Sequence, residues 1–278
     1  MSYFNRLGLI KEPFSTSPDP EFFYPSLSHY LCLKRLEINI RLKRGLSIVL
    51  GEVGVGKTTL SRALLKTFNS EEDFVFHLVL DPGLNSEYMF LSALARLFGI
   101  ICASASIIDL KEAIEKYLFQ RGVEENKTII LLIDEGQKLS VENLEVLRTL
   151  LNFETNEYKL LQLVILGQDE LLKTIQPIKN FTDRAALMYS IGPLSEKETR
   201  EMIDFRLEQA NYRGLNSLFD EEATNLIYKH THGYPRKIAM ICHDALVEMV
   251  IKETPQVDKE IINGLIEVKE KYEKCYAA

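Results

Sequence analysis

One short segment constrains the fold of this chain more than any other. Residues 51–58 read Gly-Glu-Val-Gly-Val-Gly-Lys-Thr, which is the pattern G-x-x-x-x-G-K-[ST]. An apolar run at 46–50 precedes the segment, and residues 58–68 follow it with apolar side chains at helical spacing. A strand, a glycine-rich loop and a helix in this order form the context that a phosphate-binding loop requires. The alternative, a glycine-rich turn with an incidental lysine, fits this context poorly.

The chemistry of such a loop assigns a role to its polar groups. Glycines let the backbone N–H groups turn inward, where they and the start of the helix hold a β-phosphate. The Lys57 ammonium supplies charge to the β- and γ-phosphates, and the Thr58 hydroxyl is a ligand for Mg²⁺. The expected ATP-binding residues are Gly51, Glu52, Val53, Gly54, Val55, Gly56, Lys57, Thr58 and Thr59.

A second part of the expected nucleotide site follows the apolar run 128–133. Asp134 and Glu135 come directly after this run, which places them at the carboxyl edge of a sheet, where open α/β sheets bind ligands. We expect Asp134 to hold Mg²⁺ through water and Glu135 to act as general base toward the attacking water. The alternative is a solvated pair of acids at a strand end, which the glycine loop upstream disfavours.

Strands and helices alternate along the chain up to residue 193. Apolar runs of strand length lie at 46–50, 74–80, 128–133 and 160–166. Helical patterns lie at about 26–43, 58–68, 86–98, 107–120, 141–154 and 168–175. Continuous apolar strands separated by helices predict an α/β fold, with a P-loop parallel sheet covered by helices on both faces.

The pattern changes after Pro193. Helices are expected at 196–210, 221–231, 235–251 and 258–274. These predict a small all-helical lid domain at 194–278, after an α/β core at 45–193. Residues 1–44 are expected to form a proline-rich arm and a helix that belong to the same ATP-binding domain. The arm, up to Pro25, is expected to be irregular because each proline disfavours helix in the residue before it.

Composition argues against several other classes. The chain has 278 residues, a net charge of −7 and 46% hydrophobic residues, so it offers no general attraction to nucleic acid or anionic membranes. The four cysteines, Cys32, Cys102, Cys242 and Cys275, lack metal-ligand spacing and are interpreted as reduced thiols. The apolar runs are too short to span a bilayer and the N-terminus lacks a secretory signal. We therefore expect a soluble, cytoplasmic protein without direct membrane insertion.

Six sequence blocks, in order along the chain, carry a resemblance to a known family. They are FSTSPDPEFFY at 14–24, GEVGVGKTTL at 51–60, DEGQKLS at 134–140, LLNFET at 150–155, ILGQDEL at 165–171 and GYPR at 233–236. With these blocks the chain resembles the AAA+ ATPases, and more closely the ATPase domain of the ExeA/GspA-type general secretion ATPases. That family shares ancestry with the transposition ATPases of the MuB, TniB and TnsC type. The resemblance covers nearly the whole chain.

The resemblance implies roles for three further residues. Gln168 resembles sensor 1, which orients the attacking water or contacts the γ-phosphate. Arg236 resembles sensor 2, on a lid helix that folds over the nucleotide. Arg184 resembles an arginine finger offered to the ATP of a neighbouring subunit, which implies a homo-oligomer with nucleotide at its interfaces. The plainer alternatives are a helix cap for Gln168, a surface arginine for Arg236 and an internal salt bridge for Arg184.

The chain also departs from the family pattern. Gly136 stands where relatives commonly carry alanine, a change expected to have little effect on the chemistry. Asp81 stands where they often carry asparagine, which leaves open whether a polar group there restrains Glu135. Secretion ATPases of this type usually continue into a membrane segment and a periplasmic peptidoglycan-binding part, so that role is not carried over. In the arm, Phe14 or Pro18 is a candidate apolar contact for the adenine.

Three functions remain open on the sequence. The first is an AAA+ ATPase that hydrolyses Mg-ATP to drive oligomer assembly and to remodel a protein partner in secretion or type IV pilus assembly. The second is an ATP-dependent, duplex-DNA-binding regulator of transposition, which the shared ancestry and basic residues between positions 34 and 44 suggest, although a solvated helix face is the favoured explanation of those residues. The third is a non-enzymatic nucleotide switch, which Glu135 argues against.

Overall fold

The computed structural model describes residues 3–101, 106–214 and 217–276, with side chains up to residue 271. Contacts between residues divide the chain into two compact units. The first comprises Leu27–Val53 and Lys57–Ile191, and the second comprises Met1–Ser26, Gly54–Gly56 and Gly192–Ala278. Each unit has a hydrophobic core of its own.

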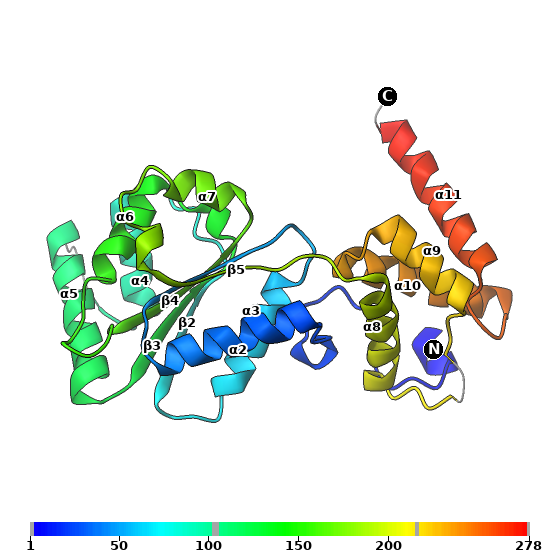
Figure 1. The fold of residues 1–278 in the computed structure, drawn as a ribbon, viewed down its shortest axis with the longest axis horizontal. Coiled ribbons are helices and arrows are strands. Elements are labelled where there is room, and N and C mark those ends of the chain that lie inside the picture. The colour runs from blue at the N-terminus through cyan, green and yellow to red at the C-terminus, as the bar shows by residue number, and fades with distance from the viewer. Residues whose placement is uncertain (1–2, 102–105, 215–216, 277–278) are drawn as a thin grey trace. The chain divides into compact units, whose positions relative to one another are not determined.

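The first unit is built on a five-stranded parallel sheet with the order β2-β3-β4-β1-β5 (Figure 1). Its strands are β1 (Leu46–Leu50), β2 (Phe74–Val79), β3 (Thr128–Ile133), β4 (Leu161–Gly167) and β5 (Ala185–Ser190). The three inner strands β3, β4 and β1 are buried along their whole length. Burial on both faces explains their continuous apolar sequences, and the predicted parallel α/β fold is confirmed.

Helices cover both faces of this sheet (Figure 1). On one face lie α2 (Leu27–Arg41) and α3 (Lys57–Phe68), which contact each other and the inner strands. On the other lie α4 (Glu87–Leu97), α5 (Ile107–Phe119), α6 (Val141–Leu150) and α7 (Glu170–Ile175). Alternate strand residues such as Ile48, Leu131 and Leu163 join these four helices in one core, because successive strand side chains point to opposite faces.

Side-chain caps fix several of these helix starts. Ser86, Ser106 and Ser140 each accept a hydrogen bond from the backbone N–H three residues further on, at the starts of α4, α5 and α6. Such a cap satisfies one of the N–H groups that a helix start leaves without an intrahelical partner. The observed starts lie within a residue or two of the predicted ones.

Two elements differ from the sequence-based prediction. No strand was expected at Ala185–Ser190, where β5 forms an edge strand that pairs only with β1. Most of its side chains are exposed or half-buried, so it lacks the apolar run that marks the inner strands. The helix predicted over 141–154 is too long, because α6 ends at Leu150 and the chain then turns back through an antiparallel bridge between Glu154 and Lys159.

The second unit contains the predicted C-terminal helices. They are α8 (Glu196–Gln209), α9 (Glu221–Thr231), α10 (Pro235–Lys252) and α11 (Lys259–Tyr276). Apolar residues from these helices, such as Met202, Ile227 and Leu246, form one core. Ser195 and Asp220 cap α8 and α9, so local sequence again sets where the helices begin.

The N-terminal arm groups with these helices rather than with the sheet. Phe14 is 1% exposed and packs edge-on against Phe219, with ring centroids 5.8 Å apart. Arg206 donates to the carbonyls of Pro13 (3.3 Å) and Ser15 (3.2 Å). The grouping therefore differs from the expected boundary at residue 44, because α2 belongs to the sheet unit and the arm does not. A fully buried ring has no surface to offer adenine, which corrects the role expected for Phe14.

Other sequence-based expectations concern cysteines, membranes and metals. Cys32 and Cys242 are buried free thiols, and burial raises the pKa of both; Cys102 and the Cys275 side chain lie outside the described residues. In the part of the chain that the structure describes, no helix has the length and apolar character needed to cross a bilayer. The same residues contain no group of three or more His, Cys, Asp and Glu side chains placed to hold a metal ion.

Candidate nucleotide-binding site

The glycine loop leaves β1 at the carboxyl edge of the sheet and ends where α3 begins. The N–H of Gly51 donates to the carbonyl of Gly167 (3.1 Å), which fixes the start of the loop to the end of β4. Gly54 and Gly56 have φ angles of 86° and 104°, a backbone region that residues with a Cβ rarely adopt. The loop therefore leads directly into a helix N-terminus, where backbone N–H groups and the helix dipole favour a bound anion.

Lys57 lies at this helix start and is almost fully buried. Its Nζ donates to the carbonyls of Gly51 (2.7 Å) and Glu52 (2.9 Å). Burial lowers the pKa of Lys57, and the carboxylates of Glu135 and Asp134 oppose that shift. Neutral carbonyls compensate a buried ammonium only in part, so an anionic ligand at this position would be stabilised by pairing with it.

Thr58 and Asp134 bring a hydroxyl and a carboxylate together. Thr58 Oγ1 donates to Asp134 Oδ2 at 2.7 Å, across 76 residues of sequence. Asp134 is buried, and its N–H donates to the carbonyl of Val79 (2.9 Å) on the neighbouring strand. Hydroxyl and carboxylate oxygens are the ligands that Mg²⁺ prefers. This partly buried oxygen pair, of which Thr58 is next in sequence to Lys57, therefore fits the expected metal.

Glu135 follows in an unusual backbone conformation, with φ 53° and ψ 38°. This left-handed region is uncommon for a residue with a side chain, and such conformations concentrate at functional sites. The N–H of Glu135 donates to Asp134 Oδ1 (2.9 Å), and its Oε2 accepts from Gln137 Nε2 (2.7 Å). The half-buried carboxylate thus lies at the edge where the general base is expected, and its catalytic role remains a prediction.

Gln168 follows β4 at the same edge of the sheet. Its N–H donates to Oε1 of Gln137 (3.1 Å). The residue at the cap position of α7 is Asp169, so the plainer role considered for Gln168 is not the one observed. Sequence reasoning assigned no role to Gln137, which links Glu135 to Gln168. Its position two residues after Glu135 gives a weak signal, because nothing local reveals a partner 31 residues away.

Arg184 lies at the amino edge of the sheet, the edge at which the parallel strands begin. It precedes β5, whose first residue Ala185 pairs with Leu46 at the start of β1. β1 then extends about 13 Å before the glycine loop, at about 3.3 Å per residue. Arg184 Nη1 donates to the carbonyl of Arg148 (3.2 Å) and to Oδ1 of Asn152. Arg184 is therefore separated from the glycine loop of its own chain by the length of the strand.

Arg236 lies in the second unit, in the first turn of α10. Pro235 occupies the first helical position, where its fixed φ and missing N–H are favourable. The N–H of Arg236 donates to the carbonyl of Gly54 (3.1 Å), a residue that clusters with the same unit. A Cβ on Gly54 would lie 3.2 Å from the Cβ of Arg236. The role of Arg236 as sensor 2 stays a prediction.

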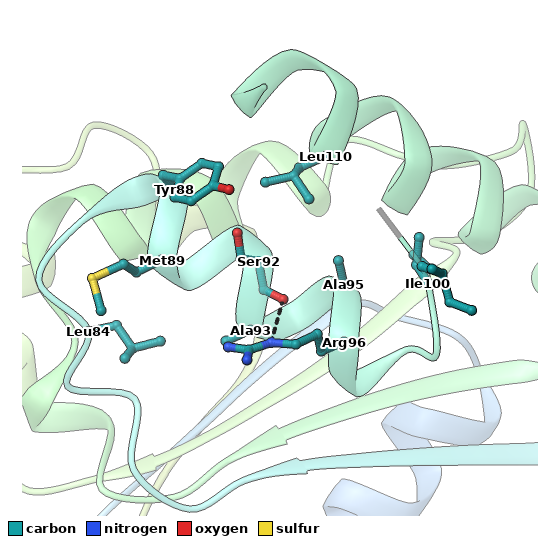
Figure 2. A pocket seen from close by; sticks show the side chains of 10 residues that line it. Leu84, Tyr88, Met89, Ser92, Ala93, Ala95, Arg96, Ile100 and Leu110 are labelled. Atoms are coloured by element: carbon teal, nitrogen blue, oxygen red, sulfur yellow. Dashed lines mark hydrogen bonds between the residues drawn. The ribbon is translucent and has the colours of Figure 1, made fainter. Parts of the chain in front are cut away.

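A separate cavity of about 590 Å³ lies over α4 (Figure 2). Its lining includes Leu84, Tyr88, Met89, Ser92, Arg96, Ile100 and Leu110. Arg96 Nε donates to the carbonyl of Ser92 on the same helix (3.4 Å), as Figure 2 shows. The residues predicted for the nucleotide site do not line this cavity, so it is not part of that site.

The strand order and the positions of these residues define a class of protein. β1 lies between β4 and β5 and carries the glycine loop, and β3 carries the acid pair at the same edge. A P-loop on a five-stranded parallel sheet, in a chain with a separate helical unit, is the AAA+ fold.

Comparisons with known proteins agree with this class. Residues 40–175 match the family model described as an AAA domain. The chain is 33% identical over 254 residues to general secretion pathway protein A of Aeromonas hydrophila, an alignment that covers 88% of this chain and 44% of that protein. Residues 40–175 are therefore similar to AAA domains, and the chain is related to general secretion pathway protein A. It spans less than half the length of that relative.

Solved structures show the same fold at low sequence identity. The Aeropyrum pernix ORC2 protein, in complexes with ADPNP and ADP, matches with a TM-score of 0.67 and 16% identity, over 92% of this chain and 71% of that one. Drosophila ORC bound to DNA matches with a TM-score of 0.66 and 20% identity, over 95% of this chain and 65% of that one. At these identities the likeness concerns the fold.

Proposed function

We propose that this chain is an ATPase, which binds Mg-ATP at the glycine loop and hydrolyses it. The observation that carries the proposal is the 2.7 Å contact between Thr58 and Asp134, next to the buried Lys57. This contact joins the glycine loop and the strand-end acids into a single site. The site contains the Lys57 ammonium and the side-chain oxygens of Thr58 and Asp134. The AAA-domain match supports the nucleotide-binding class.

Each residue of the site has a definite role in the proposed reaction. The loop N–H groups bind the β-phosphate, and Lys57 exchanges the carbonyls of Gly51 and Glu52 for phosphate oxygens. Mg²⁺, held by Thr58 and Asp134, would neutralise charge on the β- and γ-phosphates. Glu135 accepts the proton of the attacking water. Gln168 orients that water or contacts the γ-phosphate, and the products are ADP and inorganic phosphate.

Hydrolysis also depends on assembly in this proposal. Arg184 is the arginine finger for a neighbouring copy, and its place at the amino edge supports a role in trans. In its own chain the guanidinium pairs with a neutral carbonyl and with the neutral Asn152, so the charge of a neighbouring γ-phosphate would be a stronger partner. The oligomer would carry nucleotide at its interfaces, with Arg236 of the lid helix over the γ-phosphate.

We place the biological role in secretion or type IV pilus assembly, where ATP-driven assembly remodels a protein partner on the cytoplasmic side. The support is the relative named general secretion pathway protein A, of which this chain spans 44%. The net charge of −7 also favours a protein partner over nucleic acid.

The decisive experiment compares Lys57→Ala with Lys66→Ala. Both changes remove one lysine from α3, but Lys57 is buried at the loop and Lys66 is exposed in the last turn. Lys57→Ala is expected to weaken ATP affinity about 100-fold, since the charged partner of the phosphates is lost, and to reduce phosphate release to background. Lys66→Ala should leave both unchanged. Undiminished affinity and turnover in Lys57→Ala would overturn the proposal.

A second comparison separates hydrolysis from a nucleotide switch. Glu135→Gln keeps the shape of the side chain but removes the proton acceptor, so phosphate release should fall about 100-fold or more while ATP still binds. Equal phosphate release by wild type and Glu135→Gln would indicate a switch instead of a hydrolase.

Binding to duplex DNA is the second candidate function, and the DNA-bound structural neighbour favours it. The basic residues that suggested it are partly neutralised in this chain. Arg41 pairs with Glu37 (3.2 Å) and Glu71 (2.7 Å), and Lys34 also pairs with Glu37 (2.9 Å). A mobility shift of duplex DNA that requires ATP and weakens with salt, together with DNA-stimulated turnover, would favour this function over the first.

A further inference from the structure

Gln137 uses both ends of its side-chain amide at the candidate site. Nε2 donates to Glu135 Oε2 at 2.7 Å, and Oε1 accepts from the backbone N–H of Gln168 at 3.1 Å. An ionised carboxylate can only accept and a backbone N–H can only donate, so the two partners fix the orientation of the amide. A glutamate at position 137 could accept from the N–H of Gln168 but could not donate to the Glu135 carboxylate.

One glycine allows the close approach on which this bridge depends. A Cβ at Gly136 would lie 2.5 Å from Cγ2 of Ile165 and 3.1 Å from the carbonyl oxygen of Leu166, whereas a Cβ at Gly167 would be in ordinary contact with the backbone N of Gln137, at 3.4 Å. The turn after β3 and the end of β4 are therefore packed closely against each other. This packing brings the amide of Gln137 within reach of Gln168.

The backbone of Glu135 is fixed independently of the bridge. Its N–H donates to Asp134 Oδ1 (2.9 Å), and its left-handed conformation leaves only the side-chain torsions to be set. The bond from Gln137 sets those torsions by holding Oε2. The other carboxylate oxygen, Oε1, is then the one oriented to accept a proton from water.

We propose that Gln137 is a positioning residue for hydrolysis, which holds the Glu135 carboxylate and couples its orientation to the backbone at Gln168. The inference rests on the proposed function. Through the same amide, a shift of Gln168 on contact with the γ-phosphate is transmitted to the general base. Gln137 thus makes the orientation of the base dependent on what occupies the γ-phosphate position.

The first test is a double-mutant cycle on turnover. Gln137→Leu removes the donor and the acceptor while leaving Glu135 in place, and the kcat for ATP should fall about 10- to 100-fold because a base displaced by about 1 Å loses up to about 10²-fold. ATP affinity should stay within about threefold. In a Glu135→Gln background the same change should alter kcat less than about twofold, since the group that it positions is already absent.

The second test uses Gln137→Glu and the split between kcat and ATP affinity. This variant keeps the size of the side chain and an acceptor for the N–H of Gln168, but an ionised carboxylate cannot donate to Glu135. Its kcat should fall about as far as that of Gln137→Leu, while ATP affinity stays within about threefold.

A matched control lies at the other edge of the sheet. The amide of Gln162 also bridges two segments, since Oε1 accepts from the N–H of Gly45 (2.8 Å) and Nε2 donates to the carbonyl of Lys159 (2.8 Å). Gln162→Leu should lower thermal stability and leave both kcat per folded molecule and ATP affinity unchanged.

The outcomes separate this inference from the proposed function. If wild type does not hydrolyse ATP, or if Glu135→Gln has no effect, both fall together. If those two results hold but Gln137→Leu leaves kcat unchanged, or lowers it equally in the Glu135→Gln background, the positioning role alone is overturned. A kcat equal to that of wild type in Gln137→Glu also counts against it.

Discussion

The two edges of the sheet use the same kinds of polar side chain for different purposes. At the carboxyl edge, the Gln137 amide holds a carboxylate and Lys57 covers the carbonyls of the glycine loop. At the amino edge, the Gln162 amide joins one backbone N–H to one carbonyl, and Arg184 rests on a carbonyl and on Asn152.

The two edges differ in how far their polar groups balance one another in hydrogen bonding and in charge. At the amino edge, the buried Gln162 side chain accepts from one backbone N–H and donates to one backbone carbonyl, so each of these groups has a hydrogen-bond partner. The carboxyl edge instead gathers two acids, a buried ammonium and a helix start, and such a set is completed by a polyphosphate with its cation. In the proposed function, the carboxyl edge therefore carries the chemistry within one chain, and the amino edge contributes through Arg184, toward another copy.

The largest expected effect tests whether the two edges act on the ATP of different chains. Arg184→Ala should lower ATP turnover about 10³-fold under conditions of assembly, the scale of an arginine finger supplied in trans. Its own glycine loop should bind ATP as tightly as wild type does, because that loop lies at the other edge. Phosphate release and ATP affinity, measured on the same preparation, check both statements.

Mixing variants sharpens this test of Arg184. Arg184→Ala retains the carboxyl-edge groups, and Glu135→Gln retains the finger, so a mixture should recover turnover at interfaces where the two meet. If the mixture shows only the sum of its two components, the finger does not act between chains.

The next effect concerns stability at the amino edge. Gln162→Leu leaves the N–H of Gly45 and the carbonyl of Lys159 without their side-chain partner, and the unfolding free energy should fall by about 3 kcal/mol. Chemical denaturation checks this value. A large loss of turnover in protein that remains folded would break the comparison, because it would give the amino edge a catalytic role in cis.

Gly136 provides the corresponding stability test at the carboxyl edge. Relatives commonly carry alanine here, and the change was expected to matter little to the chemistry, yet a Cβ at Gly136 would lie 2.5 Å from Cγ2 of the buried Ile165. Gly136→Ala should therefore lower the unfolding free energy by about 2 kcal/mol through overpacking. Pairing it with Ile165→Val, which keeps both branches on Cβ, should not relieve the clash, whereas Ile165→Ala should.

The smallest expected effect is a pH dependence of stability that arises from His77, in the sheet that carries both edges. The pKa of His77 on β2 is lowered from 6.5 to about 4, mainly by burial, against a hydrogen bond with the backbone of Leu97 that raises it and with a smaller contribution from the charge of Arg121. Its Nε2 lies 2.9 Å from the Tyr117 hydroxyl. The folded state therefore prefers the neutral ring, so its stability contribution is present above about pH 6.5 and is lost as the pH falls toward 4. The loss should be about 1 kcal/mol, since the ring is partly exposed to solvent. Urea unfolding at pH 7.5 and pH 5 should show it in wild type and not in His77→Gln.

Much of the fold was predictable because its signals are local. The inner strands are apolar throughout, and serine or aspartate caps mark several helix starts. β5 escaped prediction because an edge strand needs no continuous apolar run. The packing of the arm against the C-terminal helices was not predictable because the partner of Phe14 is Phe219, about two hundred residues further along the chain.

The candidate site divides in the same way. Its motif residues could be named from spacing alone, because strand, loop and helix geometry bring the glycine loop and the strand-end acids to one edge of the sheet. The link through Gln137 could not be named, since it depends on the packing of Gly136 and Gly167 between two segments.

By itself, the sequence determined the P-loop, the acid pair, the alternation that forms a parallel sheet and the similarity of residues 40–175 to AAA domains. Those features depend on residues that are neighbours in the chain, where backbone geometry leaves few alternatives. The tertiary structure alone decided that Glu135 is held by Gln137, that Arg184 rests on Asn152 at the far edge, and that Phe14 is buried among the C-terminal helices. The contacts of Arg184 and Phe14 join segments far apart in sequence, and the bond between Gln137 and Glu135 depends on how the turn after β3 packs against the end of β4. The packing of the folded chain fixes such distances.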